Sequence, residues 1–322
     1  MVQYCCIWFL RPITSAKIRS ENMLPAKVNI VEVGARDGLQ NETAVTLVDK
    51  IRLINQLSTS GLKHIEAGSF VSPKWVPQMA DSEQVFAGIT QHPDVIYSAL
   101  TPNIAGLERA LESGVKQIAV FGSASEAFSQ KNINCSIAES ISRFEPVIEL
   151  AQQHNIPVRG YLSCTMVCPY EGEIKPEQTT AVANTLFDIG CYEISLGDTV
   201  GKATPNRVIA MLDSLLTQLP KDALAVHFHD TYGQALANIY QALLMGINTI
   251  DSAVSGLGGC PYAKGASGNV ATEDVLYLCE QLGIETGIDL NIINEAGWQI
   301  CRALGKRPSS KVALALGDPH SL

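Results

Sequence analysis

Two histidines separated by one residue stand at the end of a predicted strand, where they could hold a metal ion. His227 and His229 flank Phe228, and because side chains alternate along a strand, both imidazoles face the same side. Asp37 and Asp198 also follow predicted strands directly. Imidazole nitrogens and carboxylate oxygens together bind divalent cations. The alternative interpretation is a pair of core histidines hydrogen-bonded to their neighbours, with the aspartates as caps or turn residues.

Other polar residues lie near or just after the ends of predicted strands and have no evident structural role. They come after several strands, and in a barrel of parallel strands the loops at the carboxyl ends share one face. We therefore predict a single site built from several loops. These residues are Arg36 and Gln40 after the first strand, Glu66 near the end of the second, Tyr161 and Ser163 near the end of the fifth, and Thr199 beside Asp198 after the sixth.

A glycine-rich segment, residues 256–269, follows the last predicted strand. Five glycines in fourteen residues let the backbone approach a ligand closely and allow the loop to move as a lid. Cys260 stands between Gly-Gly and Pro, where a tuned thiol could donate or accept a proton. The other eight cysteines are interpreted as small buried hydrophobic residues.

The elements that position these residues repeat one unit, in which a short β-branched strand, a polar loop and an amphipathic helix follow one another. Several helices end in glycine just before the next strand, as at Gly61 and Gly190. The predicted strands cover residues 28–33, 64–67, 95–100, 117–121, 158–163, 193–196, 225–229 and 249–254. The predicted helices cover residues 46–60, 104–113, 137–154, 176–190, 204–219, 234–245 and 272–282.

Eight such units over about 260 residues match the size of a (β/α)8 barrel, whereas a doubly wound open sheet usually has fewer strands. We predict an α/β fold, a TIM barrel over residues 25–290. A poorly ordered N-terminal extension over residues 1–24 and a helical tail over 291–322 complete the predicted organisation. No dinucleotide-binding or P-loop glycine motif is found, which argues against those sites.

Composition excludes several classes of function. The 322 residues are 46% hydrophobic, which is enough for a large core, and 23 basic against 32 acidic residues give a net charge of −9. No nucleic-acid partner is therefore expected. No apolar run reaches the ~18 residues that would span a membrane, so no membrane partner is expected either. The cysteines form no C-x-x-C pair and fit a reducing compartment.

The N-terminal residues do not resemble a secretory signal. Their apolar run, residues 4–10, precedes the basic residues Arg11, Lys17 and Arg19, which reverses the order of such a signal. We predict a cytoplasmic protein of bacterial type, with the mitochondrial matrix as the alternative. A start-site extension before Met23 is the simplest interpretation of this segment.

Five segments resemble the 3-hydroxy-3-methylglutaryl-CoA (HMG-CoA) lyase family, and the resemblance runs from about Lys27 to Val312. The Arg-Asp pair and the His-x-His motif are shared with Claisen-condensing synthases of the same superfamily. The Gly-Gly-Cys-Pro loop and the Ser-Phe-Val-Ser-Pro-Lys-Trp segment are specific to the lyase branch. The segments are residues 31–42, 69–79, 131–136, 227–238 and 256–269.

The resemblance implies metal-dependent cleavage of (S)-3-hydroxy-3-methylglutaryl-CoA into acetoacetate and acetyl-CoA, as in leucine degradation and ketone-body formation. It implies a divalent metal, Mg²⁺ or Mn²⁺, although two histidines with one carboxylate would also hold Fe²⁺ or Zn²⁺. The implied ligands are Asp37, His227, His229 and the amide oxygen of Asn269.

The resemblance also implies roles for the remaining site residues. It assigns Arg36 to the enolate oxygen and Cys260 to protonation of the departing carbanion. The other catalytic candidates are Asp37, His227, Glu66 and Asp198, the last two as bases or as residues that support the metal site. The group that removes the hydroxyl proton stays open among these candidates. The predicted substrate-binding residues are Arg36, Gln40, Tyr161 and Arg307, the last within a basic run at 306–311.

The predicted partners are a CoA thioester substrate and a second copy of the chain in a homodimer. The sequence ends in Pro-His-Ser-Leu and lacks the C-terminal Cys-Lys-Leu of animal members, so a peroxisomal address is not expected.

Two enzyme alternatives stay open, a lyase for a longer 3-hydroxy-3-alkylglutaryl-CoA and a Claisen-condensing synthase. A non-catalytic binding module is the third hypothesis, and it would leave the predicted metal ligands without a role.

Overall fold

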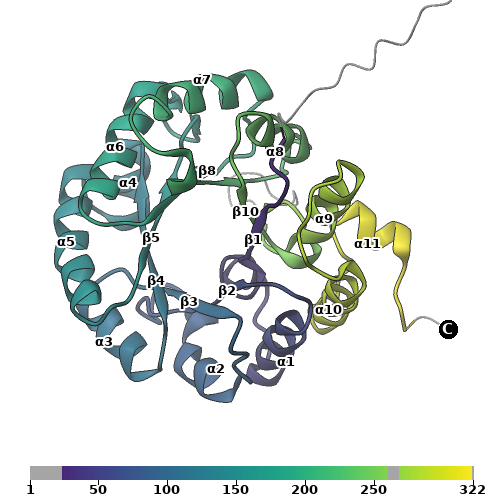
Figure 1. Cartoon of the computed structure of the whole chain (residues 1–322). Coiled ribbons are helices and arrows are strands. Elements are labelled where there is room, and N and C mark those ends of the chain that lie inside the picture. Colours follow the sequence, from purple (N-terminus) through teal and green to yellow (C-terminus); the bar gives the residue numbers. More distant parts are fainter. Residues whose placement is uncertain (1–23, 260–267, 321–322) are drawn as a thin grey trace, which may run out of the picture.

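The computed structural model describes residues 24–259 and 268–320, and in these residues eight parallel strands close into a barrel (Figure 1). The strand order around the barrel is β1-β10-β9-β8-β5-β4-β3-β2. This confirms the TIM barrel and all eight predicted strands. Their bounds are β1 Asn29–Glu32, β2 His64–Ser69, β3 Ile96–Leu100, β4 Gln117–Ser123, β5 Val158–Ser163, β8 Glu193–Asp198, β9 Leu224–Phe228 and β10 Thr249–Ser252.

The strands are covered by helices on the outside and filled by side chains on the inside. Every residue of β5, β8 and β10 is buried, as parallel strands with both faces covered require. The helices between strands ring the barrel (Figure 1). Their bounds are α1 Leu47–Ser58, α2 Ser82–Gly88, α3 Ile104–Glu112, α4 Glu126–Ile133, α5 Ile137–Gln153, α6 Pro176–Asp188, α7 Pro205–Leu215, α8 Ala235–Leu244 and α9 Thr272–Gln281.

Local capping explains where several helices begin. The side chains of Thr46, Asn103 and Ser125 each accept a hydrogen bond from a backbone N–H in the first turn of α1, α3 and α4. Ser136 forms a full capping box with Glu139 at the start of α5. These caps satisfy backbone donors that would otherwise lack partners at the helix ends.

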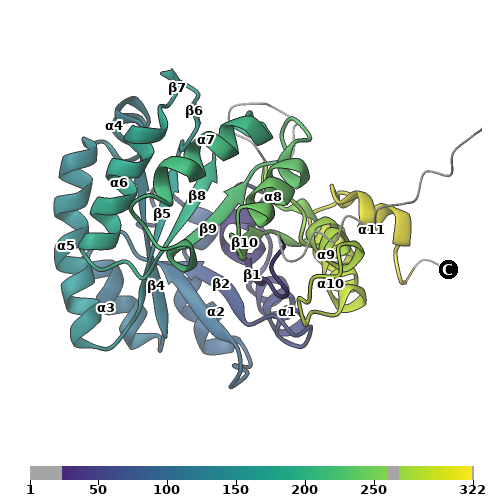
Figure 2. The ribbon, with the colours of Figure 1, turned by 45° about the horizontal axis from the view of Figure 1, so that its top comes forward.

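Two helices and one hairpin of the described structure were not predicted. Helices α2 and α4 have seven and eight residues, too few for a clear helical periodicity. The third is a hairpin, β6 Val167–Cys168 with β7 Gly172–Glu173, which lies after β5 and projects above the barrel between α4 and α7 in Figure 2. Strand β9 also ends one residue earlier than predicted, because His229 forms an antiparallel bridge with Asn269.

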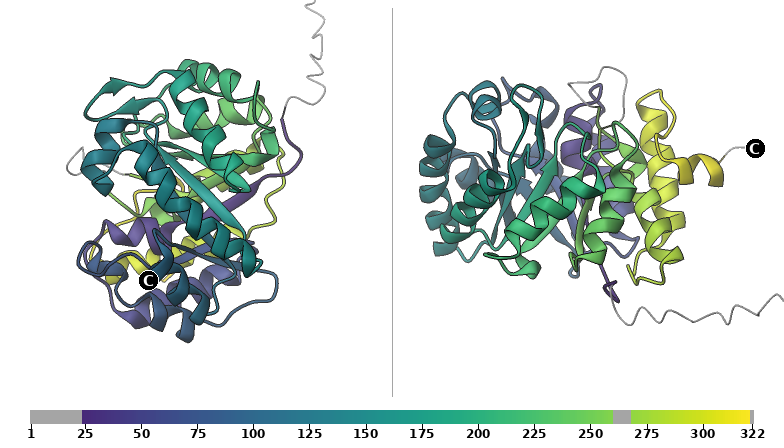
Figure 3. Two further views of the ribbon diagram at one scale, coloured as in Figure 1. Left: turned by 90° about the vertical axis from the view of Figure 1, so that its left-hand side faces the viewer. Right: turned by 90° about the horizontal axis from the view of Figure 1, so that it is seen from above.

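The C-terminal residues are helical, as predicted, and lie against the outside of the barrel (Figure 3). Helix α10, Leu290–Ala303, packs against α1 and α9, and α11, Lys311–Leu316, packs against α9 and α10. Trp298 Nε1 donates a hydrogen bond to the carbonyl of Ala313 at 3.2 Å, which joins the two C-terminal helices. Helix α10 thus fills the place between α9 and α1 in the outer ring.

The predicted extension over 1–24 lies outside the described residues except for Leu24. Among the helices of the described part of the chain, none has the length and apolar character needed to cross a membrane.

Candidate metal centre and active site

Three predicted ligands converge at the carboxyl end of the barrel. One ligand atom from each of Asp37, His227 and His229 lies within 4.8 Å of the others. Asp37 belongs to a helical turn, Gly34–Gly38, that follows β1, whereas the histidines stand at and just beyond the end of β9. The buried Nδ1 of His229 has no hydrogen-bond partner in the described structure. An unpaired imidazole nitrogen beside a carboxylate fits a divalent cation.

The two imidazoles have different protonation equilibria. Burial lowers the pKa of His229 to about 4, and the charge of His227 adds to this shift, so its ring is neutral and can act as a ligand. Burial also opposes the charged form of His227. The hydrogen bond to Asp251 and the charges of Asp251 and Asp37 outweigh that cost, and the pKa of His227 rises above its ordinary value. His227 is thus held by carboxylates on both sides.

Asn269 lies beside the cluster with its amide nitrogen toward Asp37. Asn269 Nδ2 donates to Asp37 Oδ2 at 2.9 Å and to the carbonyl of Leu257 at 3.1 Å. In this orientation the amide oxygen does not face the carboxylate. Rotation of the amide, which would place its oxygen where Nδ2 now lies, would end both of these hydrogen bonds.

Arg36 is the buried cation of the site. Its Nε donates to Glu66 Oε2 at 2.7 Å, and its Nη1 donates to Asp37 Oδ1 at 2.9 Å. Its guanidinium carbon lies 5.3 Å from the centre of the Tyr161 ring, within cation–π range. Burial would raise the pKa of Asp37, but the charges of Arg36 and His227 more than compensate, and the Asp37 carboxylate stays ionised.

A cavity of about 160 Å³ opens beside these residues. Its polar lining residues come mainly from the Arg-Asp turn and the His-x-His motif. Its apolar lining residues are aromatic and aliphatic. The polar lining residues include Arg36, Asp37, Gln40, Tyr161, His227 and His229, and the apolar ones are Phe121, Phe128 and Leu162. The cavity thus combines cation-binding groups with an apolar wall.

The Arg-Asp turn is joined to the segment after β10 and to the start of α9 by a buried glutamate. Glu32 accepts hydrogen bonds from the N–H groups of Gly34 and Val254 at 2.7 and 2.9 Å and from Thr272 Oγ1 at 2.6 Å. Burial raises the pKa of Glu32 to about 7. This one side chain joins residues that are more than 200 positions apart, and it fixes the turn that carries Arg36.

The remaining predicted residues lie at different distances from the cluster. Gln40 Nε2 donates to Asp37 Oδ1 at 3.2 Å, and Glu66 lies behind Arg36 with its Oε1 buried and unpaired in the described structure. Asp198 accepts a hydrogen bond from the Ala203 N–H at 2.9 Å and is not among the described residues that line the cavity.

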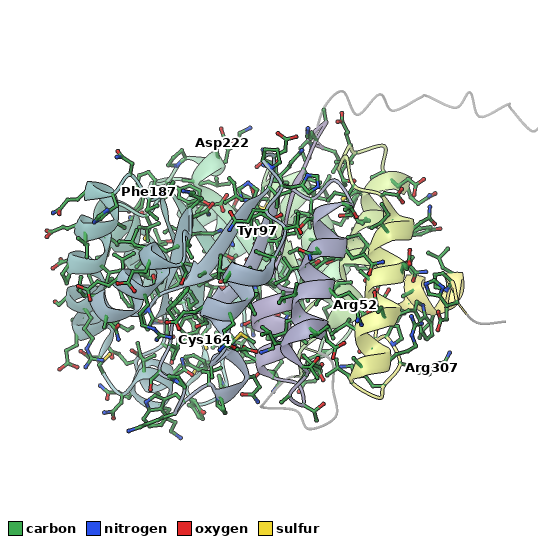
Figure 4. All side chains as sticks on the ribbon, turned by 90° about the horizontal axis from the view of Figure 1, so that it is seen from below. Arg52, Tyr97, Cys164, Phe187, Asp222 and Arg307 are labelled. Atoms are coloured by element: carbon green, nitrogen blue, oxygen red, sulfur yellow. The ribbon has the colours of Figure 1, made fainter. Side chains whose placement is uncertain are left out.

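Arg307 is exposed and lies outside the cluster. Figure 4 shows it on the outside of the C-terminal helices, toward the same end of the barrel as Cys164, which follows β5. Cys260 lies outside the described residues, so its predicted place in the site is not described.

Three charged residues inside the barrel were not predicted as part of the site. Asp251, Arg159 and Glu193 are buried and linked by ion pairs of 2.6 to 2.8 Å, and Asp251 Oδ2 lies 3.2 Å from His227 Nδ1. A signal was present, because Arg159 and Asp251 interrupt otherwise uncharged strands. Buried charged residues inside a strand need partners, but the sequence does not say which.

A parallel (β/α)8 barrel with a ligand cluster and a buried arginine at the carboxyl ends of its strands has the organisation of a TIM-barrel enzyme. The HMGL-like family model matches residues 27–300. The chain belongs to the HMG-CoA lyase family, and it is a lyase. The family assignment made from the sequence is therefore confirmed.

Two relatives illustrate the similarity. The chain is 59% identical over 294 residues to the 3-hydroxy-3-isohexenylglutaryl-CoA/hydroxy-methylglutaryl-CoA lyase of Pseudomonas aeruginosa, covering 91% of this chain and 98% of that protein. It is 61% identical over 293 residues to the cytoplasmic 3-hydroxy-3-methylglutaryl-CoA lyase of Rattus norvegicus, covering 91% of this chain and 85% of that protein.

Solved structures agree. The hydroxymethylglutaryl-CoA lyase of Pseudomonas aeruginosa superposes with a TM-score of 0.90 at 59% identity, covering 92% of this chain and 99% of that one. An HMG-CoA lyase from Acinetobacter baumannii, solved with coenzyme A and 3-methylmalate, superposes with a TM-score of 0.86 at 39% identity, covering 92% of this chain and 97% of that one.

Proposed function

We propose that this lyase cleaves (S)-3-hydroxy-3-methylglutaryl-CoA into acetoacetate and acetyl-CoA in a metal-dependent reaction, in leucine degradation and ketone-body formation. The observation that carries the proposal is the convergence of Asp37, His227 and His229 on one point beside a cavity that Arg36 also lines. The names of the relatives support the substrate.

Asp37, His227 and His229 would hold Mg²⁺ or Mn²⁺, with Asn269 as a fourth ligand after rotation of its amide. One carboxylate with neutral ligands leaves net positive charge for an anionic substrate. The bound cation would polarise the hydroxyl and the free carboxylate of the substrate and so lower the pKa of that hydroxyl.

Arg36 stabilises the charge that develops on the thioester oxygen when the C–C bond breaks. Its guanidinium is always protonated, and Glu66 holds it in place through Nε and Nη2. A preorganised donor at such an oxygen lowers the barrier by roughly 3 to 4 kcal/mol.

Two proton transfers complete the reaction. The hydroxyl proton leaves to a base as the ketone of acetoacetate forms, and the electron pair of the broken C–C bond passes to the thioester enolate. Cys260 then protonates the enolate carbon to give acetyl-CoA. Glu66 and Asp198 are both proposed as candidates for the base. Glu66 lies closer to the cluster through its contact with Arg36.

Gln40 and Tyr161 are proposed to contact the acyl group, because both line the cavity. Arg307 is proposed to bind the phosphates of coenzyme A, since it is an exposed cation near the carboxyl end of the barrel. The superposition on a lyase solved with coenzyme A supports a CoA thioester as the substrate.

A longer 3-hydroxy-3-alkylglutaryl-CoA is the second candidate substrate. The Pseudomonas aeruginosa relative is named for an isohexenyl substrate as well as for the methyl one. In this chain the alkyl group would meet the apolar wall of Phe121, Phe128 and Leu162. Product analysis with acyl-CoA esters of increasing alkyl length distinguishes the two substrates.

We further propose that the protein acts as a cytoplasmic homodimer. The Rattus norvegicus relative at 61% identity is named as cytoplasmic, and others at 54% identity are named as mitochondrial. Light scattering and cell fractionation test the two parts of this proposal.

The decisive experiment is an acetoacetate assay on protein treated with a chelator and then supplied with Mg²⁺ or Mn²⁺. We expect activity to disappear with the chelator and to return with either metal. Cys260→Ser should lose more than 100-fold in kcat while still binding metal. Cys191→Ala is the matched control, because burial raises the pKa of that thiol to about 12 and it precedes β8 at the opposite end of the barrel. Full activity in the presence of chelator, or in Cys260→Ser, would contradict the mechanism.

A further inference from the structure

Asp251 lies inside the barrel on β10, directly beside His227 on β9. The two residues are paired in the strand register, and β9 and β10 are neighbours in the barrel. Asp251 is buried, and its Oδ2 lies 3.2 Å from His227 Nδ1. The other ring nitrogen, Nε2, lies 3.9 Å from Asp37 Oδ2. His227 therefore has one carboxylate on each side of its ring, and only Asp37 belongs to the cluster that could hold a cation.

The contacts of Asp251 identify it as an acceptor. Arg159 donates through Nη1 to Oδ2 at 2.9 Å and through Nη2 to Oδ1 at 2.8 Å. Ser195 Oγ donates to Oδ2 at 2.6 Å. With a guanidinium on both oxygens, Asp251 is held as a carboxylate, so the hydrogen atom in its bond to His227 must come from Nδ1.

A proton on Nδ1 of His227 determines whether the other ring nitrogen, Nε2, can act as a metal ligand. A neutral imidazole carries one proton, so a proton on Nδ1 leaves the lone pair on Nε2, which faces Asp37. A carboxylate behind a ligand histidine fixes both the tautomer and the angle of the ring. Without it, either tautomer and a turned ring become accessible.

We propose that Asp251 is a positioning residue that holds His227 with Nδ1 protonated and Nε2 free for the metal. The proposal rests on the metal site of the proposed function. Arg159 supports Asp251 in this role, because it is itself fixed by Glu193 at 2.6 Å and packs over Tyr161 with 5.2 Å between its guanidinium carbon and the ring centre. The buried network of Glu193, Arg159 and Asp251 thus contacts the metal-ligand cluster through the hydrogen bond between Asp251 and His227.

The first test needs no variant. Long-range ¹H–¹⁵N NMR on the metal-free wild-type protein, above the pH at which His227 loses its extra proton, reports which ring nitrogen carries the remaining proton. We expect Nδ1 to be protonated and Nε2 to be bare, both in the metal-free protein and with Mg²⁺ added. A proton on Nε2 in the metal-free protein would overturn the inference, whatever the variants do.

The second test is Mn²⁺ affinity, measured by calorimetry on chelator-treated protein. Asp251→Asn should weaken binding by roughly 10- to 100-fold, the loss found when the partner of a ligand histidine is removed. Glu193→Gln is the matched control, because it changes the charge of a second Arg159 partner that does not touch His227. We expect it to change the affinity by less than about threefold.

The outcomes are distinguishable. Equal Mn²⁺ affinity in Asp251→Asn and the wild type, or equal losses in both variants, would contradict the positioning role. If Asp251→Asn does not fold, the NMR result on the wild-type protein decides whether Nδ1 of His227 carries the proton, as the proposal requires. If the wild-type protein itself binds no Mn²⁺, the proposed function fails, whereas the NMR experiment still reports the tautomer of His227.

Discussion

Two buried arginines, Arg36 and Arg159, contact the same aromatic ring but have different surroundings. Their guanidinium carbons lie 5.3 and 5.2 Å from the centre of Tyr161, and both side chains are almost fully buried. Arg159 engages both oxygens of Asp251 and one of Glu193. Arg36 engages a single oxygen of Glu66 and one of Asp37, and it lines the cavity.

The difference separates an arginine that links strands of the barrel and supports His227 through Asp251 from an arginine that lines the cavity. Arg159 is paired with both oxygens of Asp251 and with Oε1 of Glu193, so this arginine links β5, β8 and β10. Around Arg36, Glu66 Oε1 is left without a partner in the described structure, and the guanidinium borders open space. Incomplete pairing of buried charged groups is costly, and it is commonly found where a ligand completes the pairing.

The largest loss of stability at neutral pH is expected when the ion pairs of Arg159 are removed. Arg159→Met leaves Asp251 and Glu193 buried without their cation, and it should lower the free energy of unfolding by about 3 to 5 kcal/mol. Urea denaturation measures this loss. Unfolding at the same urea concentration as the wild type would show that the Arg159 network does not stabilise the fold.

Arg36→Lys should separate catalysis from stability. A lysine keeps a positive charge near Glu66 but loses the planar fork that donates to two carboxylates. We expect kcat to fall by about 10²- to 10³-fold, with a loss of less than about 2 kcal/mol in unfolding free energy. Steady-state kinetics and urea denaturation of one preparation give both numbers. A variant with wild-type kcat would remove Arg36 from the reaction.

Glu273, a buried carboxyl group with no arginine partner among the described residues, extends the comparison, and its effect should appear only as a dependence of stability on pH. Burial raises the pKa of Glu273 to about 8, and its oxygens accept hydrogen bonds from the Ser255 N–H at 3.0 and 2.8 Å. In contrast, the charge of Arg159 overcomes the effect of burial on Asp251, whose pKa lies well below its usual range. The two acids therefore respond to pH in opposite ways.

For Glu273 the folded state favours the neutral acid. Its stabilising contribution is complete below the ordinary pKa of about 4.5 and is lost as the pH rises toward 8, at roughly 1 kcal/mol per pH unit. Glu273→Gln should therefore flatten the fall in melting temperature between pH 5.5 and 8.5. Glu280→Gln, an exposed change on the same helix, should leave the slope unchanged. An unchanged slope in Glu273→Gln would show that this acid is ionised in the folded protein.

The sequence predicted the barrel and most of the cluster, because both depend on local patterns. Strand and helix periodicity, repeated eight times, is sufficient for a (β/α)8 fold, and the alternation along β9 was enough to place His227 and His229 on one face. The two helices that were missed, α2 and α4, have seven and eight residues, too few for a clear helical period.

Only the tertiary structure determined which distant residues meet. That Asp251 lies beside His227, that Arg159 bridges Asp251 and Glu193, and that the amide nitrogen of Asn269 faces Asp37 all depend on how the strands close and in what register. The helical character of α10 was evident in the sequence, but its place between α9 and α1 was not. The physical reason is that periodicity reports which face of an element is buried, whereas the identity of the partner across the barrel is determined by closure of the whole sheet.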